Sequence, residues 1–311
     1  MLYSKLRLGE EVSKFTLGTV QLGLDYGMAN AVGKPSEEQA FGILDAAFEA
    51  GVNSLDTAVA YGTSEEVIGH YLKAKGPRFY VTSKFSVRGS EDPAAAFHEK
   101  QEKTLTRIGG VKMYFFHDAV EVDAYGDVLR PHLEKMKADG YADYIGTSVY
   151  DEKDVEEFIH KEWLDAIQVP MNMLDRRIID SGCLEELEKQ GRPVFVRSVF
   201  LQGMLCMEKV PDDYSFMQPY IDELHDIAKA ESMTLPQMAM VYIRDLPGVT
   251  SLVLGCDTAD QVRNNAEMLN SRPISKAGQD AIRALGLRVP IEKCMSIVKV
   301  GGGRRYVGVK K

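Results

Sequence analysis

Short apolar runs alternate with stretches of helical periodicity from residue 15 to about residue 270. Eight of these runs are expected to be strands, at residues 15–17, 52–55, 79–82, 112–116, 143–145, 166–169, 194–196 and 251–254. Strands and helices that alternate this regularly indicate parallel strands joined by helical crossovers.

The first helix, expected over residues 36–50, carries the usual start and stop signals. Ser36 and Gln39 fit a capping box, and Gly51 follows the end of the helix. Its apolar face consists of Ala40, Phe41, Leu44, Ala47 and Phe48. Further helices are expected near residues 64–75, 93–108, 126–139, 151–160, 181–190, 220–231, 235–245 and 258–269.

Eight strand–helix units favour an α/β fold of the closed (β/α)8 TIM-barrel type over an open doubly wound sheet. An open sheet that binds dinucleotides should carry G-x-G-x-x-G after its first strand, whereas "LGTVQLGLDYG" has glycines at 18, 23 and 27. We therefore predict a single barrel domain over residues 1–295, followed by a basic, glycine-rich tail over residues 296–311.

Composition and charge narrow the choice of partner. The chain has 311 residues, 45% of them apolar, and a formal net charge of −9. This charge argues against nucleic acid or an anionic membrane as the partner, because both require a concentrated basic surface. The expected ligand is a small molecule, and the oligomeric state stays open.

The cysteines and the apolar runs also predict a compartment. The four cysteines, at 183, 206, 256 and 294, form no C-x-x-C pair, so we expect buried thiols in a reducing environment. No apolar run approaches the roughly 18 residues that cross a bilayer, and the N-terminal stretch lacks the apolar core of a signal peptide. The sequence thus predicts a cytoplasmic protein.

Four ionisable side chains follow three consecutive predicted strands. Asp56 and Tyr61 come after the second run, Lys84 after the third and His117 after the fourth. Each has an ordinary structural explanation, such as a helix cap for Asp56 or a solvated tip for Lys84. In a barrel, however, the carboxyl ends of the strands share one rim, so together these residues predict an active site.

The four residues suit proton transfer to a carbonyl oxygen. The Lys84 ammonium stabilises the phenolate form of Tyr61 and so makes the phenol a better acid, while Asp56 orients Lys84 and offsets part of this effect. His117 can hydrogen-bond a substrate carbonyl or relay a proton to Tyr61. The chemistry needs no metal, and a hydride from a nicotinamide cofactor fits a site that has an acid but no nucleophile.

Six motifs then point to a family. In their order and spacing, "LDTAVAYG", "VTSK", "FFHD", "IGTS", "AIQV" and "GCDTADQVRNN" make the chain resemble the aldo-keto reductases over about residues 15–270. The resemblance implies a (β/α)8 barrel that binds NADP(H) or NAD(H) across the carboxyl ends of its strands. It also implies a catalytic tetrad of Asp56, Tyr61, Lys84 and His117, with Tyr61 as the general acid.

The resemblance further implies a cofactor site. Its residues would be Gly18, Thr19, Val20, Asp56, Ser148, Gln168, Arg197, Ser198, Leu201, Gly203, Gly255, Asp257, Thr258, Gln261, Asn264 and Asn265.

Three positions depart from the family pattern. Val149 replaces an Asn that contacts the nicotinamide amide. Arg197 replaces an aromatic residue that stacks on the nicotinamide, and its guanidinium could stack similarly or bind an anionic substrate. Asp257 stands where NADP-preferring members carry a basic side chain, which favours NAD(H). Arg263 lies near enough to favour NADP(H), so the choice stays open with a slight preference for NAD(H).

The substrate prediction rests on polar residues near the rim. Tyr26, Tyr61, His117 and Asp118 are expected to contact the substrate, and this mixture suits a small, sugar-like aldehyde or ketone. Further lining candidates are Leu24, Asp25, Met28, Tyr150 and Asn172. Two alternatives remain: a non-catalytic nicotinamide-nucleotide sensor or scaffold, and a barrel enzyme with unrelated acid–base chemistry such as an isomerase.

Overall fold

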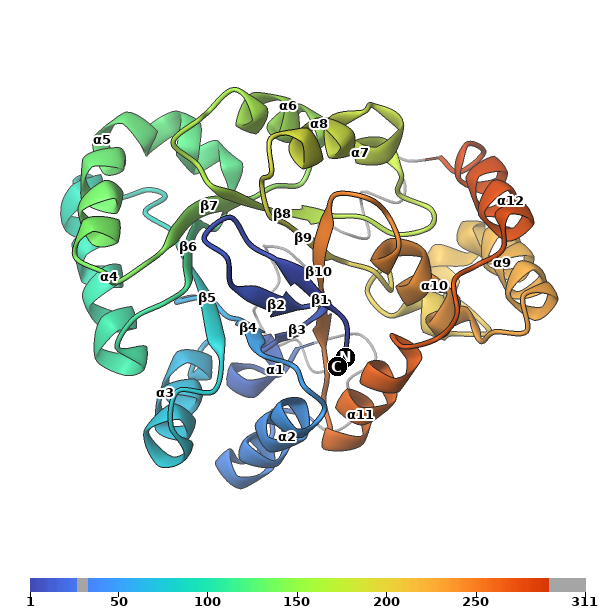
Figure 1. Ribbon diagram of the computed structural model, residues 1–311, viewed down its shortest axis with the longest axis horizontal. Helices are drawn as coiled ribbons and strands as arrows, with labels where there is room; N and C mark the ends of the chain where they lie inside the picture. Colours follow the sequence, from blue (N-terminus) through green and yellow to red (C-terminus); the bar gives the residue numbers. More distant parts are fainter. Residues whose placement is uncertain (27–32, 291–311) are drawn as a thin grey trace.

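Eight parallel strands form a closed barrel in the computed structural model, which describes residues 1–26 and 33–290. Each strand pairs with the next along the chain, and β10 closes the ring by pairing with β3 (Figure 1). The strands are β3 (Phe15–Gly18), β4 (Ser54–Asp56), β5 (Tyr80–Phe85), β6 (Met113–Phe116), β7 (Tyr144–Ser148), β8 (Ala166–Pro170), β9 (Val194–Arg197) and β10 (Val249–Gly255). The predicted (β/α)8 barrel is confirmed, and each strand overlaps one predicted run.

Helices surround this ring on its outside (Figure 1). They are α2 (Glu37–Glu49), α3 (Ser64–Lys75), α4 (Pro93–Ile108), α5 (Ala119–Ala138), α6 (Glu152–Ile159), α7 (Arg177–Asp180), α8 (Cys183–Lys189), α9 (Gln218–Ala230), α10 (Leu235–Arg244), α11 (Ala259–Met268) and α12 (Lys276–Gly286). The capping box predicted for the first of them is present, because Ser36 accepts from the Gln39 N–H and the Gln39 side chain accepts from the Ser36 N–H.

Two predicted helices have different bounds. Helix α5 begins at Ala119 rather than near residue 126, because Asp118 caps it by accepting from the Val120 N–H at 3.2 Å. The helix predicted over residues 181–190 is α8, which begins only at Cys183 because Gly182 before it adopts φ 83°. Helices α7 and α12 and the single turn α1 (Val20–Gly23) were not predicted.

An N-terminal hairpin, also not predicted, closes one end of the barrel. Strands β1 (Tyr3–Lys5) and β2 (Glu11–Ser13) pair antiparallel and lie across the centre of the ring in Figure 1. Leu6 and Val12 pack against inward-facing residues of the barrel, which are Met113, Phe115, Tyr144, Ala166 and Phe195. Burial of these side chains plugs this end, so a ligand must enter from the other.

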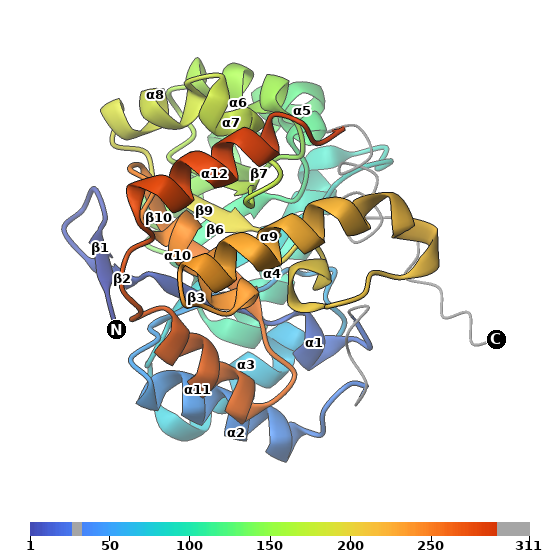
Figure 2. The same cartoon turned by 90° about the vertical axis from the view of Figure 1, so that its right-hand side faces the viewer.

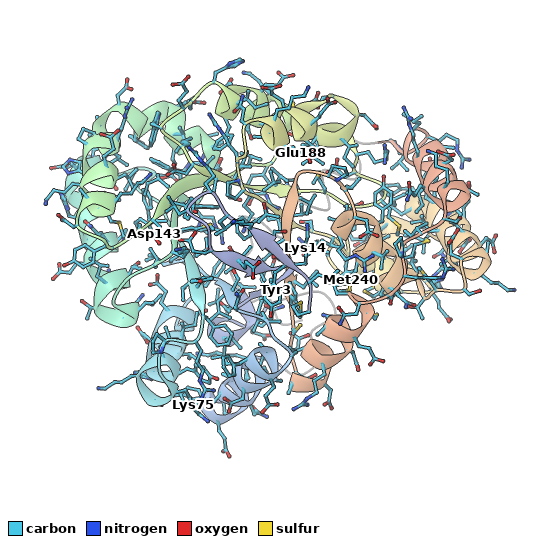
Figure 3. The ribbon with its side chains drawn as sticks, viewed as in Figure 1. Tyr3, Lys14, Lys75, Asp143, Glu188 and Met240 are labelled. Atoms are coloured by element: carbon cyan, nitrogen blue, oxygen red, sulfur yellow. The ribbon has the colours of Figure 1, made fainter. Side chains whose placement is uncertain are left out.

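Polar contacts fix the hairpin in this position. Tyr3 donates to the Gly51 carbonyl at 2.9 Å, and Lys14, just after β2, donates to the Val249 carbonyl at 2.5 Å. Both side chains lie over the middle of the ring in Figure 3. Figure 2 shows the hairpin at the left end of the molecule and α1 further to the right, beyond β3.

The remaining sequence predictions have mixed outcomes. Cys183 and Cys256 are buried as predicted, but Cys206, the last residue of the short helix η1 (Met204–Cys206) after β9, is exposed. Cys294 and the predicted tail over residues 296–311 lie outside the described residues. None of the helices in residues 1–26 and 33–290 is long and apolar enough to cross a membrane.

Candidate active site

A buried ion pair between Asp56 and Lys84 forms the base of the site. Asp56 is the last residue of β4, and Lys84 lies inside β5, which extends three residues beyond the predicted run. The Lys84 Nζ lies 2.6 Å from both carboxylate oxygens, and the two side chains are 1% and 6% exposed. Gln168 Nε2 on β8 donates to Asp56 Oδ1 at 2.7 Å. Asp56 is therefore held from two sides of the barrel.

Tyr61 and His117 lie above this pair. The two rings meet edge to face with centroids 5.8 Å apart, and the Lys84 Nζ lies 5.3 Å from the Tyr61 ring centroid. His117 follows β6 directly and is partly buried, as is Tyr61. The structure thus brings together the four side chains that the sequence singled out.

A network of hydroxyl groups holds the turn that carries Tyr61. Ser64, at the start of α3, accepts from Thr57 Oγ1 at 3.0 Å and lies 2.9 Å from both the carbonyl oxygen and the hydroxyl of Thr19. Thr19 in turn donates to the Asp56 carbonyl at 2.8 Å. All of these hydroxyls are buried, so the turn is tied to the strand end that carries Asp56.

Close packing of glycines fixes the same turn against α1. A Cβ at Gly23 would lie 1.8 Å from the Tyr61 carbonyl oxygen, and a Cβ at Gly62 would lie 2.4 Å from the Gly23 carbonyl oxygen. Gly62 also has φ 55°, which side-chain-bearing residues rarely adopt. Only glycine at both positions permits this approach of the two backbones.

Burial sets the protonation states of the site. It lowers the pKa of His117 to about 3, and the charges of Lys84 and Arg197 contribute to the shift. His117 is therefore neutral at pH 7, with one ring nitrogen able to donate and the other able to accept. Burial also lowers the pKa of Lys84, while the Asp56 carboxylate opposes that shift.

These residues line a cavity of about 490 Å³ at the carboxyl ends of the strands. It contains nearly all of the predicted site residues: Gly18, Thr19, Val20, Tyr26, Asp56, Tyr61, Lys84, His117, Ser148, Gln168, Arg197, Ser198, Gly203, Gly255, Asp257, Gln261, Asn264 and Asn265. Tyr150 also lines it, as expected. Its size and mixed lining are typical of a site for a small organic ligand.

Three predicted site residues do not line the cavity. Asp118 caps α5 and lies 3.6 Å from the Arg88 guanidinium. Thr258 caps α11 by accepting from the Gln261 N–H at 3.2 Å. Leu201 is fully buried with φ 47°. Of the further lining candidates, Leu24, Asp25 and Asn172 are absent from the lining, and Met28 lies outside the described residues.

The sequence missed three polar lining residues, Gln21, Gln202 and Cys206, and the apolar lining residues Val199, Phe200, Pro236, Val253, Leu254 and Met268. Gln21 directly follows the predicted site residue Val20, and Gln202 directly precedes the predicted site residue Gly203. Their position next to predicted residues could therefore have indicated that they line the cavity. Gln202 has φ 59° and hydrogen-bonds Tyr26. Strained backbone of this kind persists where its surroundings enforce it, often at ligand sites.

Two orphaned acceptors indicate that the cavity suits a nucleotide cofactor. Gln21 Oε1 and Asp257 Oδ1 are buried, line the cavity and have no hydrogen-bond partner in the part of the chain that the structure describes. A buried acceptor without a donor raises the free energy of the folded protein. Hydroxyl or amino groups of a ligand could donate hydrogen bonds to these two atoms. Gly255 lies close to Gln21, because a Cβ there would be 2.2 Å from Gln21 Nε2. Within the described residues, no cluster of His, Cys, Asp and Glu could hold a metal ion.

Comparison with known proteins agrees with this geometry. The chain matches the aldo/keto reductase family over residues 14–286. The oxidoreductase YqkF of Bacillus subtilis (strain 168) is 27% identical over 299 residues, which cover 88% of this chain and 92% of YqkF. The NADH-specific methylglyoxal reductase of Escherichia coli (strain K12) is 25% identical over 271 residues, which cover 72% of this chain and 80% of that enzyme.

Among solved structures, an aldo-keto reductase of Bacillus halodurans in its holo form shares the fold with a TM-score of 0.77. The two are 23% identical, and the match covers 92% of this chain and 96% of that chain. The closed barrel with a cavity at the carboxyl ends of its strands defines the (β/α)8-barrel fold class. With a match that spans most of its length, the chain belongs to the aldo/keto reductase family.

Proposed function

We propose that this protein transfers hydride between a nicotinamide cofactor and a small polar aldehyde or ketone, with Tyr61 as the general acid. The observation that carries the proposal is the convergence of Asp56, Lys84, Tyr61 and His117 at the wall of one cavity. A cofactor bound there supplies the hydride that none of these side chains can provide. The remaining groups provide positioning and proton transfer.

Lys84 and His117 have distinct roles in this proposal. The Lys84 ammonium, 5.3 Å from the Tyr61 ring centroid, favours the phenolate and so promotes release of the phenolic proton to the substrate oxygen. Neutral His117 donates a hydrogen bond to the same oxygen as negative charge develops on it. Asp56 holds Lys84 in place, which makes it a positioning residue.

The lining of the cavity supports a polar substrate. Tyr26, Gln202 and Tyr150 present polar groups close to the catalytic side chains, whereas a long apolar substrate would require a uniformly apolar wall. Methylglyoxal, named as the substrate of the Escherichia coli relative, is a carbonyl compound of this small and polar kind.

Asp257 supports NAD(H) over NADP(H). Its orphaned Oδ1 can accept a hydrogen bond from a ribose hydroxyl, but a 2′-phosphate in the same place would meet a negative charge. Arg263, the candidate for binding that phosphate, is paired with Asp260 at 2.9 Å. The NADH-specific relative is consistent with this preference.

The test is the Tyr61→Phe variant, with Tyr141→Phe as the matched control. Tyr141 loses the same hydroxyl but lies at the surface, 41% exposed. We expect Tyr61→Phe to lower kcat for carbonyl reduction at least about 100-fold, since it removes the proton donor. Its affinity for the cofactor, measured by fluorescence titration, should stay within about threefold of the wild type. Carbonyl reduction at an undiminished rate would exclude Tyr61 as the acid.

A wild type that binds cofactor but reduces no carbonyl compound would favour the sensor alternative. Activity with no nicotinamide present would favour unrelated acid–base chemistry.

A further inference from the structure

Arg197 is a partly buried cation in the cavity wall, and no carboxylate within residues 1–26 and 33–290 pairs with it. Its Nη2 donates to the Val149 carbonyl at 2.8 Å and its Nη1 donates to Ser198 Oγ at 3.3 Å. Its Cζ lies 4.3 Å from the centroid of the Tyr150 ring. These neutral partners fix the guanidinium plane, but none of them cancels its charge.

The nearby carboxylates are already paired. Asp56 is bound to Lys84, and Asp151, which follows Tyr150, lies 3.2 Å from Arg177. Among the described residues, Arg197 forms no ion pair. Its charge reaches the catalytic side chains, because it helps to lower the pKa of both His117 and Lys84. The catalytic end of the cavity therefore carries an excess of positive charge.

If the proposed function holds, this excess positive charge affects how tightly the cavity binds the oxidised and the reduced cofactor. We propose that Arg197 makes the cavity bind the reduced, uncharged nicotinamide ring more tightly than the oxidised, cationic ring. The ring that exchanges hydride with the substrate must lie near Tyr61, which protonates that substrate, and Arg197 lines the same end of the cavity. Repulsion between the guanidinium and the ring then acts only on the oxidised form.

Coulomb's law gives the size of the effect. For two like charges about 6–8 Å apart at an effective dielectric of about 40, the repulsion corresponds to about a fivefold to tenfold weaker binding of the oxidised form. In the direction of carbonyl reduction, the oxidised cofactor is a product that must leave before the next turnover. Arg197 thus promotes its release and limits product inhibition.

The experiment measures Kd for NADH and for NAD⁺ on the intact protein, by fluorescence titration and by competition against NADH. The two nucleotides share their phosphates and adenosine, so the ratio of their Kd values isolates the contribution of the nicotinamide ring. Arg197→Gln removes the charge and Arg197→Lys retains it. Arg88→Gln is the matched control, because Arg88 pairs with Asp118 outside the cavity lining.

We expect Arg197→Gln to bring Kd(NAD⁺)/Kd(NADH) down by about fivefold to tenfold. Arg197→Lys and Arg88→Gln should keep this ratio within about twofold of the wild type. If Arg197→Gln weakens both nucleotides equally, the arginine serves the shared phosphates or the local fold, and the inference is overturned. An unchanged ratio overturns it too. If the wild type binds neither nucleotide, the proposed function itself fails, and the inference fails with it.

Discussion

From the buried Asp56–Lys84 ion pair we predict a change in the free energy of unfolding that can be tested without any measurement of catalysis. Asp56→Asn leaves the Lys84 ammonium, 1% exposed, without its counter-charge. The new amide has one acceptor oxygen in place of two, so its NH₂ group faces the ammonium in either orientation, and also faces the Gln168 amide when it takes the position of Oδ1. Removal of one partner from a buried ion pair typically costs about 3–5 kcal/mol, so we expect a loss of about 3 kcal/mol or more.

A double-mutant cycle separates the interaction energy of Asp56 with Lys84 from the contacts that each side chain makes with other residues. Lys84→Met strands the carboxylate and should also cost about 3 kcal/mol, but Asp56→Asn/Lys84→Met leaves no unpaired charge. The double variant should therefore be about 2 kcal/mol more stable than the sum of the single effects predicts. The assay is urea unfolding followed by circular dichroism, with constant m-values as the check for two-state behaviour. Additivity within about 0.5 kcal/mol would refute the reasoning.

Two controls sharpen this cycle. Asp280→Asn removes an exposed pair with Lys276, in which the side chains are 57% and 82% exposed, and should cost less than about 0.5 kcal/mol.

The second control measures the stability of the wild type and of Asp56→Asn as a function of pH. Burial holds the pKa of Lys84 below that of the unfolded chain, so the unfolded state binds more protons and stability rises with pH. Without Asp56 to oppose this shift, the deficit of Asp56→Asn should shrink between pH 7 and pH 9.5.

Two further predictions concern His117 and Asp257. The pKa of His117 is about 3 in the folded protein against an ordinary value of 6.5, so its protonation favours the unfolded chain and stability falls as pH falls from 6.5 towards 3. In thermal unfolding, His117→Gln should lose less Tm between pH 6.5 and pH 4 than the wild type; equal losses would contradict this. Asp257→Asn keeps an acceptor oxygen but removes the charge, so we expect the affinity for NADPH relative to NADH to rise about tenfold in fluorescence titrations. An unchanged NADPH/NADH ratio would count against the assigned role of Asp257.

The barrel could be predicted from the sequence because its signals are local. Each strand is a short apolar run, and helices such as α2 carry their own caps. The hairpin was missed because its strands have only three residues each, which is too short to show a clear alternation of apolar and polar positions. The hairpin closes the barrel because Leu6 and Val12 contact residues from four strands that are distant in the sequence. A local sequence pattern does not predict such contacts.

The sequence could predict that the four ionisable side chains lie together, but not their protonation states or hydrogen-bond partners. Asp56, Lys84, Tyr61 and His117 could be chosen because strand ends converge in any barrel. The neutral state of His117 follows from burial, which exists only once the chain has folded. The orphaned Gln21 Oε1 and the stacking of Arg197 on Tyr150 are likewise properties of side chains that come from different strands and loops.

The loop after β3, which belongs to the proposed cofactor site, and Tyr61, the proposed proton donor, are held by the same contacts, and this limits how the site can vary. Ser64 hydrogen-bonds Thr19 in the loop after β3, and the Tyr61–Gly62 turn packs against Gly23 in α1 with no room for a Cβ. The same loop and helix present Thr19, Val20 and Gln21 to the cavity. A substitution that shifts α1 to change cofactor contacts therefore also shifts the Tyr61 hydroxyl, and misplacement of a catalytic group by about 1 Å can cost about 100-fold in rate.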